Sequence, residues 1–422
     1  AEARFTPRER AVALSAYCQG DRVLRRAMRQ HTAGEMRRIR RHRLGWWLGR
    51  LLRRRTVDRV IAAGLPFLLA LPVASCRQEP DAEVPSSPPS EARLSLLAVG
   101  DTGRTRPLAT LFEGALSVSD AMTEEAVRDP VDGIVLLGDN FYWNGLSSET
   151  LVPRVAANLV RPFCHFLRLD GPRSDEVRSA CRRPEATRSP VPIYAVLGNH
   201  DIEIEESPRL QREVLPEFLP DWQMSPGLAR AIELGHGVSL ILFESEPEID
   251  DPQAIRHALV RAIQSARGPW RILATHRPVA TDDLARPFVG GYPEFVLSSI
   301  EAAGRPVQLV LAAHHHNLQV FELGGATPLL HVGVGSGARA EPPIAEDHPD
   351  ARFGRLALGF VRVDLIGRDA DARLSATLFE APRWPVLAPL QPAVPIARFE
   401  VDRLGRVSRA LKTDHGMPPD RP

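Results

Sequence analysis

The sequence predicts an α/β domain in which short buried strands alternate with longer amphipathic segments. Six apolar runs of strand type each end in glycine or a polar residue; they span residues 94–101, 133–139, 193–199, 238–244, 270–276 and 307–314. Amphipathic, helix-like segments separate several of them, over residues 109–129, 251–267 and 293–304. Apolar runs of this length between helical segments are typical of strands that are covered on both faces.

The C-terminal part of the domain has a different pattern. Three strand-like runs joined by short turns cover residues 357–366, 372–381 and 393–403, which indicates an antiparallel set. We expect these strands to form a second sheet packed on the first. The predicted domain therefore covers residues 94–405, and residues 406–422 remain as a C-terminal tail.

The composition is that of a globular protein whose charge is unevenly distributed. Of the 422 residues, 44% are hydrophobic and 25% are charged, as in an ordinary folded chain. Residues 1–60 carry 17 arginines and five acidic residues, whereas residues 77–422 carry 36 basic and 47 acidic residues. The acidic domain argues against nucleic acid as a partner.

The N-terminal region combines a basic segment, residues 1–58, with a predicted signal peptide or membrane anchor, residues 59–76. Its apolar core has 16 residues without charge, which is short for a membrane-spanning helix and typical of a signal peptide. Arginines beside such a segment favour the cytoplasmic side of a membrane. We therefore expect the domain on the extracytoplasmic, periplasmic face of a bacterial membrane.

Three of the four cysteines, all except Cys18 in the basic segment, fit this location. The apolar segment ends in VASC, which resembles the cleavage motif of bacterial lipoproteins and makes Cys76 a candidate for lipid attachment. An uncleaved signal anchor with an incidental Cys76 is the alternative. Residues 77–93 are rich in proline, serine and glutamate and are predicted to form an extended linker. Cys164 and Cys181 could form a disulfide in an oxidising compartment.

Side chains that bind metals follow five of the six buried runs. They are Asp101 after the first, Asp139 and Tyr142 after the second, Asn199 after the third, His276 after the fifth, and His314 and His316 after the sixth. Sites in open α/β sheets form at the carboxyl ends of strands, so we expect these side chains to meet. A mixed oxygen and nitrogen set without sulfur suits two first-row ions, and a carboxylate can bridge ions about 3.5–4 Å apart.

The motifs GDTG, GDNFYWNG, GNHD, THRP and AHHHNLQ resemble, in this order, the five motifs of the metallophosphoesterases. Among these enzymes they are most similar to the purple, or tartrate-resistant, acid phosphatases. Gly103 and Tyr142 carry this narrower resemblance, because most other metallophosphoesterases have histidine in the first motif and no tyrosine in the second. The resemblance implies a four-layer α-β-β-α sandwich of two packed mixed sheets, with the metal site at the C-terminal edge of the strands.

Residue by residue, the resemblance implies two ion sites that share one carboxylate. Fe(III) would be held by Asp101, Asp139, Tyr142 and His316. A second, divalent ion (iron, zinc or manganese) would be held by Asp139, Asn199, His276 and His314. His200 would bind no metal and would protonate or stabilise the leaving group, while a metal-activated hydroxide attacks a phosphate monoester.

Three alternatives follow from the same residues. The metal site would also suit a phosphodiesterase or a nucleotide hydrolase acting on small phosphorylated substrates, or a binding protein of the envelope that has lost turnover. The intact ligand set and His200 favour an enzyme. His315 is expected to be a bystander, because side chains alternate along an extended strand. Asp201 is expected either to hydrogen-bond a metal ligand or to cap a helix. No motif indicates an oligomeric state.

Overall fold

The structure is a computed structural model that describes residues 92–104, 114–246, 251–281, 291–341, 348–383 and 392–412. All of them belong to one compact unit, Ala82–Pro422. The basic segment, the signal or anchor segment with Cys76, and the linker up to residue 91 lie outside the described residues. Within the part of the chain that is described, no helix is both long and apolar enough to cross a membrane.

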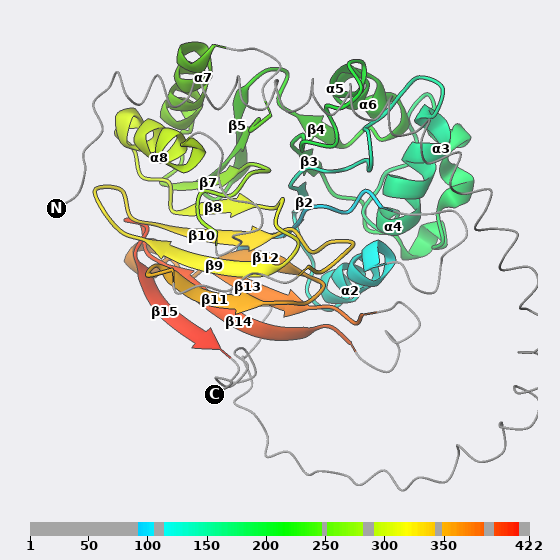
Figure 1. Ribbon diagram of the computed structural model, residues 1–422. Coiled ribbons are helices and arrows are strands. Elements are labelled where there is room, and N and C mark those ends of the chain that lie inside the picture. Colours follow the sequence, from blue (N-terminus) through cyan, green and yellow to red (C-terminus); the bar gives the residue numbers. More distant parts are fainter. Residues whose placement is uncertain are drawn as a thin grey trace, which may run out of the picture. The chain divides into compact units, whose positions relative to one another are not determined.

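Two mixed sheets form the centre of the domain (Figure 1). The first has eight strands in the order β15-β14-β13-β12-β1-β2-β3-β4. Its strands are β1 (Ala92–Val99), β2 (Gly133–Leu136), β3 (Ile193–Ala195), β4 (Trp222–Met224), β12 (Gly359–Ile366), β13 (Arg373–Glu380), β14 (Val394–Val401) and β15 (Val407–Lys412). Neighbours from β1 to β4 pair in parallel, and β12 to β15 are antiparallel.

The second sheet has seven strands in the order β11-β9-β10-β8-β7-β6-β5. They are β5 (Ala229–Gly235), β6 (Val238–Phe243), β7 (Trp270–Ala274), β8 (Leu309–Ala312), β9 (Leu318–Leu323), β10 (Leu329–Val334) and β11 (Ala351–Arg355). The central strands β6, β7, β8 and β10 pair in parallel, with antiparallel strands on either side.

Helices cover the outer face of each sheet. The eight-stranded sheet carries α2 (Gly114–Arg128), α3 (Leu151–Val155), α4 (Arg161–Phe163), α5 (Ser207–Arg209) and α6 (Leu215–Phe218), with the π-helical turns η2 (Ala156–Val160) and η6 (Leu210–Val214). The seven-stranded sheet carries α7 (Pro252–Ser265) and α8 (Tyr292–Ala303) (Figure 1). The short 3-10 turns are η3 (Ser174–Glu176), η4 (Arg178–Ala180), η5 (Glu185–Thr187) and η7 (Asp369–Asp371). The predicted four-layer α-β-β-α architecture is confirmed.

Alternation along the strands divides the core into layers. In β1, Leu96 and Ala98 face the seven-stranded sheet, whereas Leu97 and Val99 face the helices. Successive side chains of a strand point to opposite faces, so one strand supplies both layers. Because each side of β1 is buried, the strand is apolar at nearly every position, as strands between two layers usually are.

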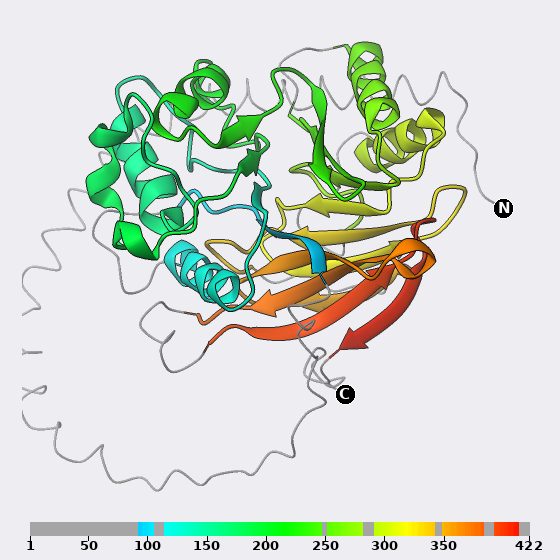
Figure 2. The ribbon, with the colours of Figure 1, turned by 180° about the vertical axis from the view of Figure 1, so that it is seen from behind.

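The division of strands between the sheets differs from the expectation. The C-terminal strands β12–β14 do not form a second sheet of their own, because β12 pairs with β1 and extends the first sheet (Figure 2). The second sheet is built from β5–β11 instead. The domain is also longer than predicted: β1 begins at Ala92, and β15 adds a strand within the predicted C-terminal tail.

A buried ion network ties the first sheet to α2. The side chain of Arg362 on β12 is 3% exposed. Its guanidinium lies 2.7 Å from a carboxylate oxygen of Asp129, 2.9 Å from Asp364 and 3.5 Å from Glu125. Burial raises the pKa of Glu125 and of Asp364, and the arginine opposes that rise. Arg362 therefore favours the ionised forms of Glu125 and Asp364, and Arg128, which lies 2.6 Å from Glu125, also favours the ionised form of Glu125.

The predicted disulfide is confirmed. Cys164 follows α4 directly, and Cys181 follows the 3-10 turn η4. The bond closes the segment between them over the outer face of the eight-stranded sheet, where Cys164 is part of the apolar core.

Candidate metal centre

The seven predicted ligands lie at the carboxyl ends of strands from both sheets. Four follow strands of the eight-stranded sheet: Asp101 after β1, Asp139 and Tyr142 on the loop after β2, and Asn199 after β3. The remaining three come from the seven-stranded sheet: His276 after β7, and His314 and His316 between β8 and β9. The candidate site therefore lies where the carboxyl ends of strands from the two sheets face each other.

A first group of donors surrounds Asp101. The hydroxyl of Tyr142 donates to Asp101 Oδ1 at 2.7 Å. His316 Nε2 lies 3.1 Å from this carboxylate oxygen and 3.1 Å from the tyrosine oxygen. The other oxygen, Asp101 Oδ2, accepts the main-chain N–H of His314 at 2.8 Å. All three donor side chains are buried.

A second group surrounds His276. Its Nε2 lies 3.2 Å from Asn199 Oδ1 and 3.2 Å from His314 Nδ1. Its Nδ1 lies 2.8 Å from the carbonyl oxygen of Leu137. A carbonyl only accepts, so Nδ1 carries the hydrogen, and in the neutral ring Nε2 presents its lone pair to the site. This is the tautomer that a metal requires.

Asp139 lies between the two groups. Its Oδ1 is 3.6 Å from His276 Nε2, and its carboxylate also interacts with the hydroxyl of Tyr142. Ligand atoms of Asp101, Asp139 and His276 all lie within 4.8 Å of one another. The structure thus brings all seven predicted ligands together, as two groups that share one carboxylate.

A family model described as calcineurin-like phosphoesterase matches residues 94–318, more than half of the chain. The chain belongs to the calcineurin-like phosphoesterase family. Members of this family use a centre of two metal ions, and the residues that surround Asp139 here are of the type that such a centre needs. No curated protein matches the chain.

Several solved structures are similar to the chain at low sequence identity. GAP50, the anchor in the inner membrane complex of Plasmodium, is 13% identical over 76% of this chain and 89% of its own, with a TM-score of 0.49. PhoD is 15% identical over 80% and 74% of the two chains, with a TM-score of 0.47. Purple acid phosphatase PPD1 from yellow lupin (Lupinus luteus) seeds is 13% identical over 68% and 51%, with a TM-score of 0.46. These distant likenesses assign no activity.

The electrostatics of this phosphoesterase site favour a bound cation. Burial raises the pKa of Tyr142 well above its ordinary value, and the nearby Asp101 and Asp139 carboxylates raise it further. Burial also raises the pKa of Asp139. Burial alone would raise the pKa of Asp101, but the field and hydrogen bond of His316 outweigh it and lower this pKa. Buried acidic oxygens in such proximity repel one another, and metal ions among them would remove that cost. The donor set therefore fits a metal centre.

Backbone strain is concentrated on the donors. Asp101, Asp139 and His314 have φ of 57°, 54° and 69°, in the left-handed region that residues other than glycine rarely adopt. Such conformations cost of order 1–3 kcal/mol each and cluster at functional sites. The loops after β1, β2 and β8 each contain one such left-handed residue, and the chain therefore turns sharply at the donor side chain soon after the strand ends.

Gly198 allows two of the motif loops to touch. A Cβ atom at this position would lie 2.2 Å from Asp139 Oδ1 and 2.3 Å from the main-chain nitrogen of Asp139. Any other residue at 198 would therefore collide with the shared carboxylate. The glycine before Asn199 in the third motif thus has a steric role in the second motif.

His200 lies beside the donor groups. Its main-chain N–H donates to Asp139 Oδ1 at 3.0 Å, and its Nε2 lies 4.0 Å from Asp139 Oδ2. The ring Nδ1 donates to the carbonyl oxygen of Trp143 at 2.7 Å. The side chain is 27% exposed, more than the buried donors around it. Nε2 is therefore the ring atom available to a substrate.

Asp201 has neither of the two expected roles. Its carboxylate accepts the main-chain N–H groups of Gly198, Asn140 and Phe141 at 2.8–3.0 Å. It is fully buried. Asp201 therefore fixes the loop after β2 to the loop after β3 through the backbone, and so positions Asp139 and Asn199 relative to each other.

The three consecutive histidines separate as expected, but for a different reason. The chain after β8 is bent and not extended, with His314 in the left-handed conformation. His315 is buried, and its Nδ1 lies 2.5 Å from the hydroxyl oxygen of Thr281. His314 and His316 join the two donor groups. The bend, rather than strand alternation, sends the middle ring elsewhere.

Two neighbouring carboxylates were not anticipated from the sequence. Glu341 Oε2 lies 3.6 Å from His316 Nδ1, on the side of the ring away from Asp101. Glu246 pairs with Arg277, the residue after His276, and this arginine also donates its main-chain N–H to Ser245. Neither glutamate follows a motif, so only the folded chain reveals these contacts.

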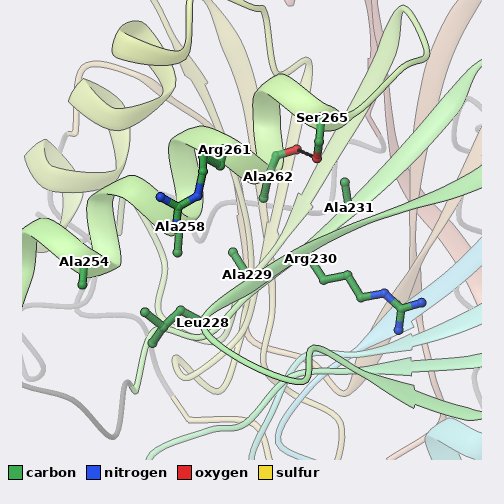
Figure 3. Close-up of a pocket in the computed structure, with 9 residues that line it drawn as sticks. All are labelled: Leu228, Ala229, Arg230, Ala231, Ala254, Ala258, Arg261, Ala262 and Ser265. Carbon is green, nitrogen blue, oxygen red and sulfur yellow. Dashed lines mark hydrogen bonds between the residues drawn. The ribbon is translucent and has the colours of Figure 1, made fainter.

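A hollow of about 580 Å³ lies away from these residues, between β5 and α7 (Figure 3). It is lined by Leu228, Ala229, Arg230, Ala231, Ala254, Ala258, Arg261, Ala262 and Ser265. It contains none of the predicted ligands and no carboxylate or imidazole. The chemistry of the donor set, and not the size of a hollow, identifies the candidate site.

Proposed function

We propose that this chain hydrolyses phosphate monoesters of small molecules at a centre of two metal ions. The observation that carries the proposal is the convergence of seven side chains into two donor groups that share Asp139. Of the two, the group with Tyr142 would hold Fe(III), since an anionic phenolate oxygen favours the harder ion. The group with His276 would hold a divalent ion: iron, zinc or manganese.

When bound, the two ions supply a nucleophilic hydroxide at mild pH and neutralise charge on the phosphate. The chain then has to supply a proton for the leaving group. His200 suits this task because its Nδ1–H is engaged by the Trp143 carbonyl, which leaves Nε2 to hold the transferable proton. The main-chain hydrogen bond from His200 to Asp139 keeps the ring beside the shared carboxylate. A hydroxide supplied by the ions makes a protein nucleophile unnecessary, so we expect no phosphoenzyme.

Metal content, colour and activity together test the proposal. The purified chain is expected to contain iron, to show the broad visible band of tyrosinate bound to Fe(III), and to hydrolyse a chromogenic phosphomonoester. Tyr142→Phe is expected to lose the band. A colourless, iron-free but active protein would contradict the Fe(III) assignment but not the proposed hydrolase activity. Activity that survives Asp139→Ala would contradict the two-ion mechanism, and activity on diesters alone would favour a phosphodiesterase.

We also propose that the domain is held on the extracytoplasmic face of a bacterial membrane by a lipid on Cys76. The disulfide between Cys164 and Cys181 supports an oxidising compartment, where such bonds persist. Metabolic labelling with a fatty-acid analogue in a bacterial host is expected to mark the chain, and Cys76→Ser is expected to abolish the label. Equal labelling of both proteins would refute Cys76 as the site of lipid attachment, and an unlabelled but membrane-bound chain would indicate the signal anchor.

A further inference from the structure

Trp143 is a large aromatic side chain left in solvent beside the candidate metal centre. It is 51% exposed, whereas its neighbours Phe141 and Tyr142 are buried. Aromatic side chains contribute most when they bury 150–250 Å². The fold uses the main-chain carbonyl of Trp143, which accepts from His200, but that contact does not depend on the indole. The hydrogen bond to His200 therefore does not account for an aromatic side chain at this position.

The position of the indole relates it to the leaving group. Its centroid lies 5.6 Å from that of the His200 ring and 5.4 Å from that of Tyr142, edge to face in both cases. In the proposed reaction His200 protonates the ester oxygen as it departs. The group attached to that oxygen must then extend away from the ions and past His200. Trp143 is the exposed aromatic surface on that side.

Arg104 fixes the indole in this position. Its guanidinium carbon lies 4.4 Å from the centroid of Trp143, a distance at which a cation and an aromatic face attract each other, and 5.8 Å from the centroid of Tyr142. The arginine directly follows the GDTG motif, so it is carried by the same loop as Asp101. The ring is therefore held at the site by an element of the metal centre itself.

We infer that Trp143 is a specificity-determining residue that selects monoesters whose leaving group carries a flat aromatic ring. Such a ring would stack on or against the exposed indole while the phosphate lies at the ions. This inference rests on the proposed function, because it assumes that the phosphate binds at the donor groups. A saturated ring of the same size offers similar apolar area but no flat π surface. Comparing an aromatic ligand with its saturated counterpart therefore isolates the contribution of stacking.

Matched ligands test the inference on the full chain with its metals. Benzyl phosphate and cyclohexylmethyl phosphate serve as substrates, since their alcohols differ in flatness more than in acidity. Benzylphosphonate and cyclohexylmethylphosphonate serve as non-hydrolysable ligands, with affinity measured by calorimetry. The variants are Trp143→Leu, which keeps an apolar side chain, and Trp143→Phe, which keeps an aromatic ring. Leu404→Ala, an exposed apolar residue on the turn before β15, is the control.

The expected result is a preference for the benzyl over the cyclohexylmethyl ligand of about tenfold, in kcat/KM and in Kd. Trp143→Leu is expected to abolish the preference, while Trp143→Phe and Leu404→Ala keep it. A preference for the benzyl ligand that survives Trp143→Leu would overturn the inference. An equal loss of kcat/KM or affinity for both ligands in that variant would also overturn it, because it would indicate an effect through His200.

The two proposals fail in different ways. Hydrolysis of both substrates without a preference would be consistent with the proposed phosphatase activity and would overturn the proposed role of Trp143. A benzyl preference in phosphonate binding without turnover would support Trp143 and contradict the hydrolase. Neither binding nor turnover would overturn both.

Discussion

Gly198→Ala is expected to disable the metal centre while leaving the fold intact. A Cβ at this position would lie 2.2 Å from Asp139 Oδ1 and 2.9 Å from Asp139 Cγ. It would also lie 2.3 Å from the main-chain nitrogen of Asp139. Ordinary contacts of this kind exceed about 3.4 Å, so the shared carboxylate and the backbone that carries it must move by roughly 1 Å. Metal ligands tolerate departures of about 0.2 Å, and a misplacement of about 1 Å costs on the order of 100-fold in rate. The overpacking itself should lower the free energy of unfolding by about 1–3 kcal/mol.

The assay compares metal content after dialysis, hydrolysis of a chromogenic phosphomonoester, and urea denaturation. We expect less than two metal ions per chain, kcat/KM reduced at least about 100-fold, and a cooperative unfolding transition that persists. Gly227→Ala is the matched control, because a Cβ there meets no atom within 4 Å. Full metal content and wild-type kcat/KM in Gly198→Ala would refute the claim that this glycine makes room for the shared carboxylate.

Three further outcomes follow from the structure. Arg362→Met should lower the free energy of unfolding in urea by about 3–5 kcal/mol, because it removes the guanidinium that pairs with the buried carboxylates of Asp129 and Asp364, whereas Glu125 keeps its ion pair with Arg128. A change below about 1 kcal/mol would contradict this. Burial lowers the pKa of His331 to about 4. Because the folded chain binds the proton less readily than the unfolded chain, His331 contributes fully to the free energy of unfolding above pH 6.5, and this contribution of about 3 kcal/mol is lost as the pH falls toward 4. In His331→Gln, the free energy of unfolding in urea should differ less between pH 7 and pH 4 than it does in the unaltered chain. An unchanged difference would show that His331 is not the source of the pH dependence. His315→Ala should retain the metal content of the unaltered chain, because the ring faces Thr281, and loss of an ion would make it a ligand.

The donor residues were predictable because each one lies in the loop that follows an apolar strand and belongs to a recognisable motif. Asp101, Asp139 and His276 needed no knowledge of distant contacts to be singled out. The partner of His200 could not be predicted, since the acceptor is a main-chain carbonyl at Trp143 and any residue has one. Glu341 was missed for a related reason: it reaches His316 only because the chain after β10 returns to the site.

The sheet membership of the strands was harder to predict than their existence. Strands such as β2 and β7 are buried on both faces, so their apolar pattern is the same in either sheet. Pairing of β1 with β12 joins residues more than 260 positions apart, and no local pattern encodes it. The strand β15 was missed because its residues, VSRALK, lack the strong apolar character of the inner strands.

Each donor group takes side chains from both sheets: Asp101 and Asn199 belong to one, His316 and His276 to the other. The dimensions of the metal centre thus depend on how the two sheets pack. Substitutions in the layer between the sheets, such as at Leu240 or Val363, would alter ion affinity by changing the separation of the sheets rather than any contact at the site. In the other direction, the ions would fasten the sandwich at one end, so that chelation loosens the architecture as well as stopping the chemistry.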